Sequence, residues 1–136
     1  MQKQPLVSLK NIKKYFPVRS GLFGKKNDFV KAVDDISLDI YPGETVGLVG
    51  ESGCGKSTTG RMIVGLSKPT GGEVYFEGKK LDDYKNKKEL GKNLQMIFQD
   101  PYSSLNPRMT VTDIIAEPLA LHKIGTKKDR RRRVDE

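Results

Sequence analysis

The sequence predicts an α/β fold, and three observations carry this prediction. Residues 50–58 read Gly-Glu-Ser-Gly-Cys-Gly-Lys-Ser-Thr, which fits the phosphate-loop pattern G-x-x-x-x-G-K-[ST]. Residues 45–49, before the loop, are apolar or β-branched apart from one glycine, as a buried strand is. After the loop, Thr58, Met62 and Leu66 recur at intervals of four residues, which predicts a helix that begins at about Lys56. Strand, glycine loop and helix therefore follow one another in the order that such a loop requires.

The residue types of the loop indicate its ligand. Glycines let the chain coil so that successive backbone N–H groups point at an anion, and the start of a helix adds further unpaired N–H groups. The Lys56 ammonium would contact β and γ phosphates, and the Ser57 hydroxyl would bind Mg²⁺. We expect a nucleoside triphosphate, with the following binding residues: Gly50, Glu51, Ser52, Gly53, Cys54, Gly55, Lys56, Ser57 and Thr58.

Cys54 is the only cysteine, so it forms no disulfide within the chain and fits a reducing compartment. Its place in the loop also suggests thiol catalysis. The alternative is stronger, because the backbone N–H does the binding at this position and the side chain need only be small. The single histidine, His122, lies far along the sequence, which disfavours a catalytic Cys-His pair.

The composition fits a folded domain, or part of one, that does not cross a membrane. The chain has 136 residues, of which 35% are hydrophobic and 31% charged. It has no apolar run near the roughly 20 residues of a membrane span, and its first residues lack the apolar core of a signal peptide. The net charge of +8 raises the question of nucleic acid. We expect no aromatic residues interleaved with the basic ones to stack bases, so nucleic-acid binding is disfavoured.

The N-terminal part is expected to be mostly sheet. Pro17, Gly21 and Gly24 mark residues 17–27 as a surface loop. An adjacent acidic pair, Asp34 and Asp35, is expected to form a turn between two strands. The expected strands are residues 6–12, 29–33, 37–40, 45–49, 73–77 and 94–98, and a short exposed helix is expected at 83–92.

Two adjacent aromatic residues close the first expected strand, Tyr15 and Phe16. Neighbouring residues of an extended segment face opposite ways, so only one of the pair can lie flat on a base. We choose Phe16 and keep Tyr15 as the alternative. From the sequence alone, it is equally plausible that both side chains only pack against neighbouring strands.

A second informative stretch follows Gln99. Asp100 and Asn106 each precede a proline, which favours extended backbone and predicts a stiff loop. Thr110 is expected to cap a helix, with Asp113 three residues later. Pro118 is expected to bend that helix or end it early. Residues 126–136 are expected to be helical.

These motifs together resemble the nucleotide-binding subunits of ABC transporters, and most of all the ATP-binding subunits of oligopeptide and dipeptide importers. The wider resemblance rests on the phosphate loop, Phe16 and the Ile-Phe-Gln-Asp-Pro of residues 97–101. The narrower one rests on residues 17–27, 51–54 and 100–110. The implied fold is an ABC-type P-loop NTPase domain with an N-terminal antiparallel β subdomain and the start of the helical subdomain, truncated.

The resemblance also implies roles and partners. Phe16 would stack on adenine, residues 50–58 would bind the phosphates of ATP, and Gln99 would be the Q-loop glutamine that positions Mg²⁺ or the attacking water. Residues 1–99 would hold the β subdomain and the P-loop part of the core, and residues 100–136 the Q-loop and the start of the helical subdomain. The implied partners are transmembrane permease subunits, a second ATP-binding subunit and, indirectly, a peptide-binding protein, at the cytoplasmic face of the membrane.

The chain departs from the family pattern after Gln99. No apolar strand ending in Asp-Glu and no glycine-rich signature follows, so we expect the N-terminal portion of a longer protein that does not hydrolyse ATP by itself. The alternatives are an ABC-type ATPase associated with nucleic acid or ribosomes, an importer ATPase for nickel or glutathione, and an unrelated P-loop kinase or GTPase.

Overall fold

The structure, a computed structural model, describes residues 4–18, 28–100 and 102–136. The chain divides into two compact units, Met1–Met96 and Ile97–Glu136. Most of the loop expected at 17–27 lies outside the described residues, as does Pro101 of the expected stiff loop.

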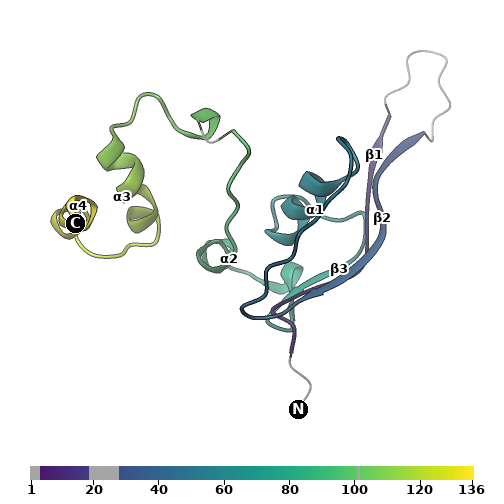
Figure 1. Cartoon of the computed structure of the whole chain (residues 1–136). Helices are drawn as coiled ribbons and strands as arrows, with labels where there is room; N and C mark the ends of the chain where they lie inside the picture. Colours follow the sequence, from purple (N-terminus) through teal and green to yellow (C-terminus); the bar gives the residue numbers. More distant parts are fainter. Residues whose placement is uncertain (1–3, 19–27, 101) are drawn as a thin grey trace. The chain divides into compact units, whose positions relative to one another are not determined.

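The first unit is built on a four-stranded antiparallel sheet (Figure 1). Its strands lie in the order β2-β1-β3-β4, so β1 is paired on both sides. The antiparallel β subdomain expected from the sequence is confirmed. The strands are β1 (Val7–Pro17), β2 (Phe29–Ile40), β3 (Gly71–Phe76) and β4 (Lys79–Lys80).

An irregularity in β1 places Ile12 in the core. Val7 and Leu9 are buried, and strict alternation would send Ile12 to the other face of the sheet. The register with β2 shifts between Leu9 and Ile12, and Asn11 has φ 48°. The extra residue turns Ile12, which is 0% exposed, to the same side as Leu9.

Helix α1 (Lys56–Ile63) packs on this sheet, and its start confirms the helix predicted from about Lys56. Thr59 and Met62 are its buried residues. Gly65, with φ 75°, follows the last turn, and Leu66 N donates to Arg61 O at 2.8 Å. The helix thus ends with a glycine in the left-handed region. The core of this unit consists of Val7, Leu9, Ile12, Val33, Met62, Val74, Phe76 and Leu90.

Two strand predictions differ from the structure in their extent. Residues 29–33 and 37–40 belong to one strand, β2, rather than to two strands around a turn. Asp35 has φ 59°, so the backbone is locally irregular, but β2 continues through it because β1 pairs on both sides of the acidic pair. β1 likewise continues past Ile12 to Pro17.

The expected strands at 45–49 and 94–98 are wrong for this structure, because neither segment is in a strand. Val49 is 91% exposed and Ile97 is 93% exposed. A β-strand is defined by its backbone hydrogen bonds to a neighbouring strand. No described residue pairs with either segment in the sheet. An apolar composition alone therefore did not produce a strand here.

The remaining helices are short. A 3-10 turn at Leu81–Asp83 and helix α2 (Lys87–Asn93) replace the single helix expected at 83–92. The second unit holds a 3-10 turn at Tyr102–Ser104, helix α3 (Val111–Leu121) and helix α4 (Lys127–Asp135). No helix of the described chain is both long enough and apolar enough to span a bilayer.

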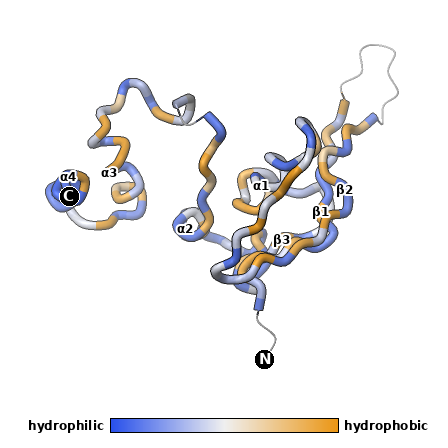
Figure 2. Tube along the Cα trace, in the orientation of Figure 1, coloured by the Kyte–Doolittle hydropathy of each residue, from blue (hydrophilic) through white to orange (hydrophobic). Residues whose placement is uncertain are grey.

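Helix α3 confirms the Thr110 cap and contradicts the early end. The Thr110 side chain accepts a hydrogen bond from Asp113 N at 3.2 Å. The helix continues past Pro118 to Leu121, because the missing proline N–H removes only one intrahelical bond near its C-terminal end. Figure 2 shows hydrophobic residues along α3. None of the residues of α3 is buried within the described chain.

Candidate nucleotide-binding site

Gly55 allows the phosphate loop to lie close against β2. Gly55 precedes α1 and has φ 94°, a left-handed conformation that favours glycine. A Cβ at this position would lie 2.2 Å from Ala32 O and 3.2 Å from Val33 Cγ2. Only glycine lets the loop approach the strand so closely. Gly53, with φ 84°, adds a second left-handed residue to the turn.

The Lys56 ammonium folds back into the loop. Its Nζ donates to Gly50 O at 2.7 Å and to Glu51 O at 2.6 Å, and it lies 3.5 Å from Cys54 Sγ. A phosphate bound to the loop would offer this ammonium stronger, charged acceptors than these carbonyls. The side chain is thus already directed at the ligand position that its motif predicts.

The start of α1 presents backbone N–H groups to an anion, with no negatively charged side chain nearby in the first turn. The first N–H groups of a helix have no partner within the helix. The first turn of α1 contains no acidic residue, and Gly55 supplies no capping side chain. Thr59 N closes the first turn on Gly55 O at 2.8 Å. The helix dipole therefore favours phosphate at this end.

The residues of the loop remain accessible to a ligand. In the structure Gly50, Glu51, Ser52, Gly53, Cys54 and Ser57 are exposed, and Gly55, Lys56 and Thr58 are half-buried. The described residues contain no group of three or more His, Cys, Asp or Glu side chains that could hold a metal ion. The Ser57 hydroxyl, which the motif predicts as a Mg²⁺ ligand, would supply one oxygen and would fit the cation only beside phosphate oxygens and water.

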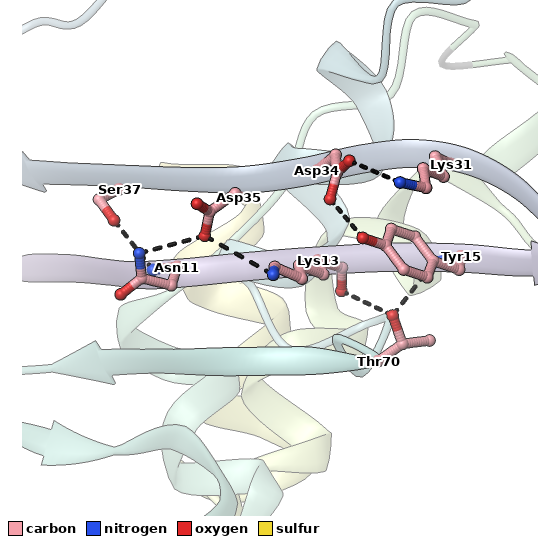
Figure 3. Close-up of polar contacts among 8 residues, drawn as sticks. All are labelled: Asn11, Lys13, Tyr15, Lys31, Asp34, Asp35, Ser37 and Thr70. Carbon is pink, nitrogen blue, oxygen red and sulfur yellow. Dashed lines mark hydrogen bonds and ion pairs between the residues drawn. The ribbon is translucent and has the colours of Figure 1, made fainter.

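The structure distinguishes between the two adjacent aromatic residues. The Tyr15 hydroxyl donates to the Asp34 carboxylate, and Lys31 Nζ lies 5.4 Å from the centre of the Tyr15 ring (Figure 3). Phe16 makes no such polar bond and is 45% exposed, with Lys14 Nζ 5.3 Å from its ring centre. The Tyr15 side chain is therefore engaged by Asp34 and Lys31 of β2, whereas the Phe16 ring remains accessible.

Asp34 is the centre of this polar contact. The hydrogen bond from Tyr15, followed by that from Lys31 at 3.2 Å, lowers the pKa of the Asp34 carboxyl below its ordinary value. The same hydrogen bond to Asp34 raises the pKa of Tyr15, and Asp34 also raises the pKa of Lys31. The group is exposed, so these contacts orient side chains more than they stabilise the fold.

Sequence reasoning missed Asp34, Lys14 and Thr70 as neighbours of the aromatic pair. The sequence predicts Asp34 in a turn, and only the register of β1 with β2 shows that its carboxylate and Tyr15 form a cross-strand pair. Thr70 N donates to Lys13 O at 2.7 Å. No local pattern indicates a contact between residues so far apart in the sequence.

Gln99 lies in the second unit, where it is exposed and follows the segment 94–98. Beyond it, Asp100 accepts a hydrogen bond from Tyr102 N at 3.1 Å. His122 also belongs to this unit and follows the end of α3. Gln99 and His122 belong to the second unit and Cys54 to the first, so the roles of Gln99 and of a Cys54–His122 pair stay predictions.

Residues 33–136 match the ABC transporter family. The chain belongs to the ABC transporter family. The family match begins inside β2 and includes the phosphate loop, α1 and the whole second unit. The resemblance stated from the phosphate loop and the Gln-Asp-Pro stretch is thereby confirmed.

The similar curated proteins include ATP-binding proteins of oligopeptide transport. The chain is 55% identical to the oligopeptide transport ATP-binding protein OppF of Bacillus subtilis and 49% identical to AppF of the same species, in each case over 98% of the chain. It is 46% identical to the glutathione import ATP-binding protein GsiA of Escherichia coli over 96% of its length. The chain spans 43%, 42% and 21% of these relatives, less than half of each.

Solved ABC cassettes share the fold. The chain aligns with the ATP-binding cassette MJ0796 in a dimeric state bound to ADP and Pi, with a TM-score of 0.73 and 33% identity over 94% of this chain and 53% of that one. It also aligns with CbiO1 of Clostridium perfringens at a TM-score of 0.69 and 23% identity, over 98% of this chain and 49% of that one. The ABC-type fold expected from the sequence is confirmed.

Proposed function

We propose that this chain is the nucleotide-binding part of an ATPase subunit that energises the import of oligopeptides or dipeptides. The observation that carries the proposal is the loop around Lys56, whose ammonium, helix start and left-handed glycines fit a triphosphate. The similarity to oligopeptide transport proteins supports the cargo class.

Each loop residue has a distinct task in this proposal. Backbone N–H groups of residues 50–58 bind the phosphate oxygens, and Lys56 leaves the carbonyls of Gly50 and Glu51 to contact β and γ phosphates. Ser57 holds Mg²⁺, which neutralises phosphate charge when bound. Phe16 stacks on adenine, and Gln99 positions the attacking water or the cation. A neutral amide orients these groups without adding negative charge next to the γ phosphate.

We assign residues 1–99 to the β subdomain and the P-loop part of the core, and residues 100–136 to the Q-loop and the start of a helical subdomain. The proposed partners are transmembrane permease subunits and a second ATP-binding subunit, identical or not, with a peptide-binding protein acting indirectly. The two MJ0796 cassettes were solved as dimers, which supports the second of these. The proposed location is the cytoplasmic face of the membrane, peripherally bound.

The decisive experiment replaces Lys56. In the intact protein, Lys56→Ala should reduce ATP affinity and peptide uptake together, because the only side-chain cation in the loop is lost. Lys85→Ala is the matched control, since Lys85 is an exposed lysine outside the loop. Unchanged ATP binding and uptake in Lys56→Ala would reject the proposal.

Glutathione is the second candidate cargo, because GsiA of Escherichia coli is 46% identical to this chain. Uptake of labelled oligopeptides, dipeptides and glutathione by cells that carry the intact transporter separates the two. Uptake of glutathione alone would reject the peptide assignment and leave the ATPase assignment in place.

We further propose that residues 1–136 alone bind ATP without hydrolysing it. The residues of this chain supply phosphate contacts, but no apolar segment followed by Asp-Glu is present in the sequence to polarise the water. ATP binding without turnover by the purified 136-residue chain is the expected result. Turnover that disappears in Lys56→Ala would reject it.

A further inference from the structure

The chain that follows α1 returns to β1 directly beside the aromatic pair. Thr70 N donates to Lys13 O at 2.7 Å, and the Thr70 hydroxyl donates to the same oxygen at 3.1 Å. That hydroxyl also accepts a hydrogen bond from Tyr15 N at 3.1 Å (Figure 3). One side chain therefore holds β1 on both sides of Lys14.

These bonds extend the pairing of β1 beyond the end of β3. The β1–β3 register ends at Lys13 opposite Gly71, so β3 has no residue that pairs with Tyr15. The Thr70 hydroxyl takes the place of the carbonyl that a longer β3 would offer to Tyr15 N. The backbone immediately before Phe16 is thus fixed from the β3 side, while β2 pairs with it from the other side.

A second contact from the same segment reaches the Phe16 ring. Lys14 Nζ donates to Lys68 O at 2.6 Å and lies 5.3 Å from the centre of the Phe16 ring. A cation over an aromatic ring is attracted to the ring face. Because the Lys68 carbonyl holds this ammonium, the Phe16 ring has a fixed neighbour on one side.

The Tyr15 side chain determines the direction of its neighbour. Its hydroxyl is bonded to Asp34, which Lys31 also contacts. Successive side chains of a strand point to opposite faces. Tyr15 is thus held on one face of β1, and Phe16 is directed to the other face.

We propose that Thr70 and Lys14 are positioning residues for base recognition: they hold Phe16 in the orientation that stacks on the base of the bound nucleotide. The proposal rests on the proposed function, in which Phe16 contacts adenine. It adds that residues 68–70, which follow the helix that begins at the phosphate loop, also set the aromatic contact. Phosphate binding and base stacking are then joined through one segment of chain.

The test compares two ligands in the intact protein, ATP and inorganic tripolyphosphate, by calorimetric titration. Thr70→Val removes the hydroxyl while keeping the side-chain shape, and Thr70→Ser keeps the hydroxyl. We expect Thr70→Val to weaken ATP binding about threefold to tenfold, the range for one lost hydrogen bond, with tripolyphosphate affinity unchanged. Thr70→Ser should bind both ligands as the parent protein does.

Two further variants separate the possible failures. Phe16→Ala should lower ATP affinity about tenfold, as expected for one lost base stack, and Lys14→Met should lower it more than Lys14→Arg does. An equal loss of ATP and tripolyphosphate binding in Thr70→Val indicates a general structural role and overturns the inference. So does normal ATP affinity in Thr70→Val or in Phe16→Ala. A parent protein that binds neither ligand counts against the proposed function itself.

Discussion

Different kinds of interaction stabilise each of the two compact units internally. In the first unit, β1 pairs with strands on both sides and the buried core draws on residues from Val7 to Leu90. In the second unit, neither α3 nor α4 has a buried residue, and each begins with a threonine cap. The first unit therefore depends on contacts between residues distant in the sequence. The second depends on contacts within α3 and α4 and between these two consecutive helices.

A second comparison concerns apolar residues in predicted strands, some of which pair with a neighbouring strand and some of which do not. Ile12 is 0% exposed inside the sheet, whereas Val49, which is equally β-branched, is 91% exposed. Both occur in segments that the sequence predicts as strands. The difference is a paired neighbour: Ile12 lies between β2 and β3, and Val49 has no ladder partner among the described residues. Among the segments predicted as strands, buried apolar residues therefore occur only in those that pair in the described sheet.

Replacing Ile12 should have the largest effect. In the 136-residue chain, Ile12→Ala should lower the free energy of unfolding by about 2–5 kcal/mol, because a fully buried side chain leaves a cavity. Val49→Ala should change it by less than about 0.5 kcal/mol, as for an exposed side chain. Urea denaturation measures both. Equal effects of the two substitutions would contradict the comparison.

A Cβ at Gly55 should have the next largest effect. Gly55→Ala would place that atom 2.2 Å from Ala32 O, so we expect a loss of about 1–3 kcal/mol and a loss of triphosphate binding. Gly43→Ala is the matched control, since Gly43 also has a positive φ, 78°, but no atom within 4 Å of its Cβ. If the control were as damaging, backbone strain rather than contact with β2 would be the cause.

Removing a helix cap should affect only the second unit. The Thr126 side chain accepts from Asp129 N at 3.3 Å, and Asp129 Oδ2 accepts from Thr126 N at 3.0 Å. Thr126→Ala should destabilise α4 by about 1 kcal/mol, seen as faster amide exchange at residues 127–135 with unchanged exchange in the sheet. Thr126→Ser should preserve the protection of α4. Faster exchange in β1 as well would show that the two units are coupled.

The smallest expected effect is the pH dependence of the Asp34 contact. Its pKa is lowered in the folded chain, chiefly by the hydrogen bond from Tyr15. The stabilisation is therefore present above the ordinary value of 3.8 and is lost as the pH falls through the lowered pKa. Denaturation between neutral and strongly acidic pH should show a steeper loss of stability in the parent chain than in Asp34→Asn. Parallel curves would mean that the contact contributes nothing.

Much of the candidate site follows from local sequence. The loop, the helix start at Lys56 and the Thr110 cap each depend on residues within a few positions of one another, and short-range geometry is enough to predict them. The contacts of Tyr15 and Phe16 were not predictable in this way. They require the register of β1 with β2 and the return of the chain at Thr70.

By itself the sequence determined the phosphate loop, the helix that follows it and the family, because these reside in residue types at fixed short spacings. Only the tertiary structure decided that Ile12 enters the core, that Tyr15 is bonded to Asp34, and that residues 45–49 form no strand here. The physical reason is that strand pairing joins residues distant in the sequence. Pairing, more than composition, then determines which side chains are buried and which remain available to a ligand.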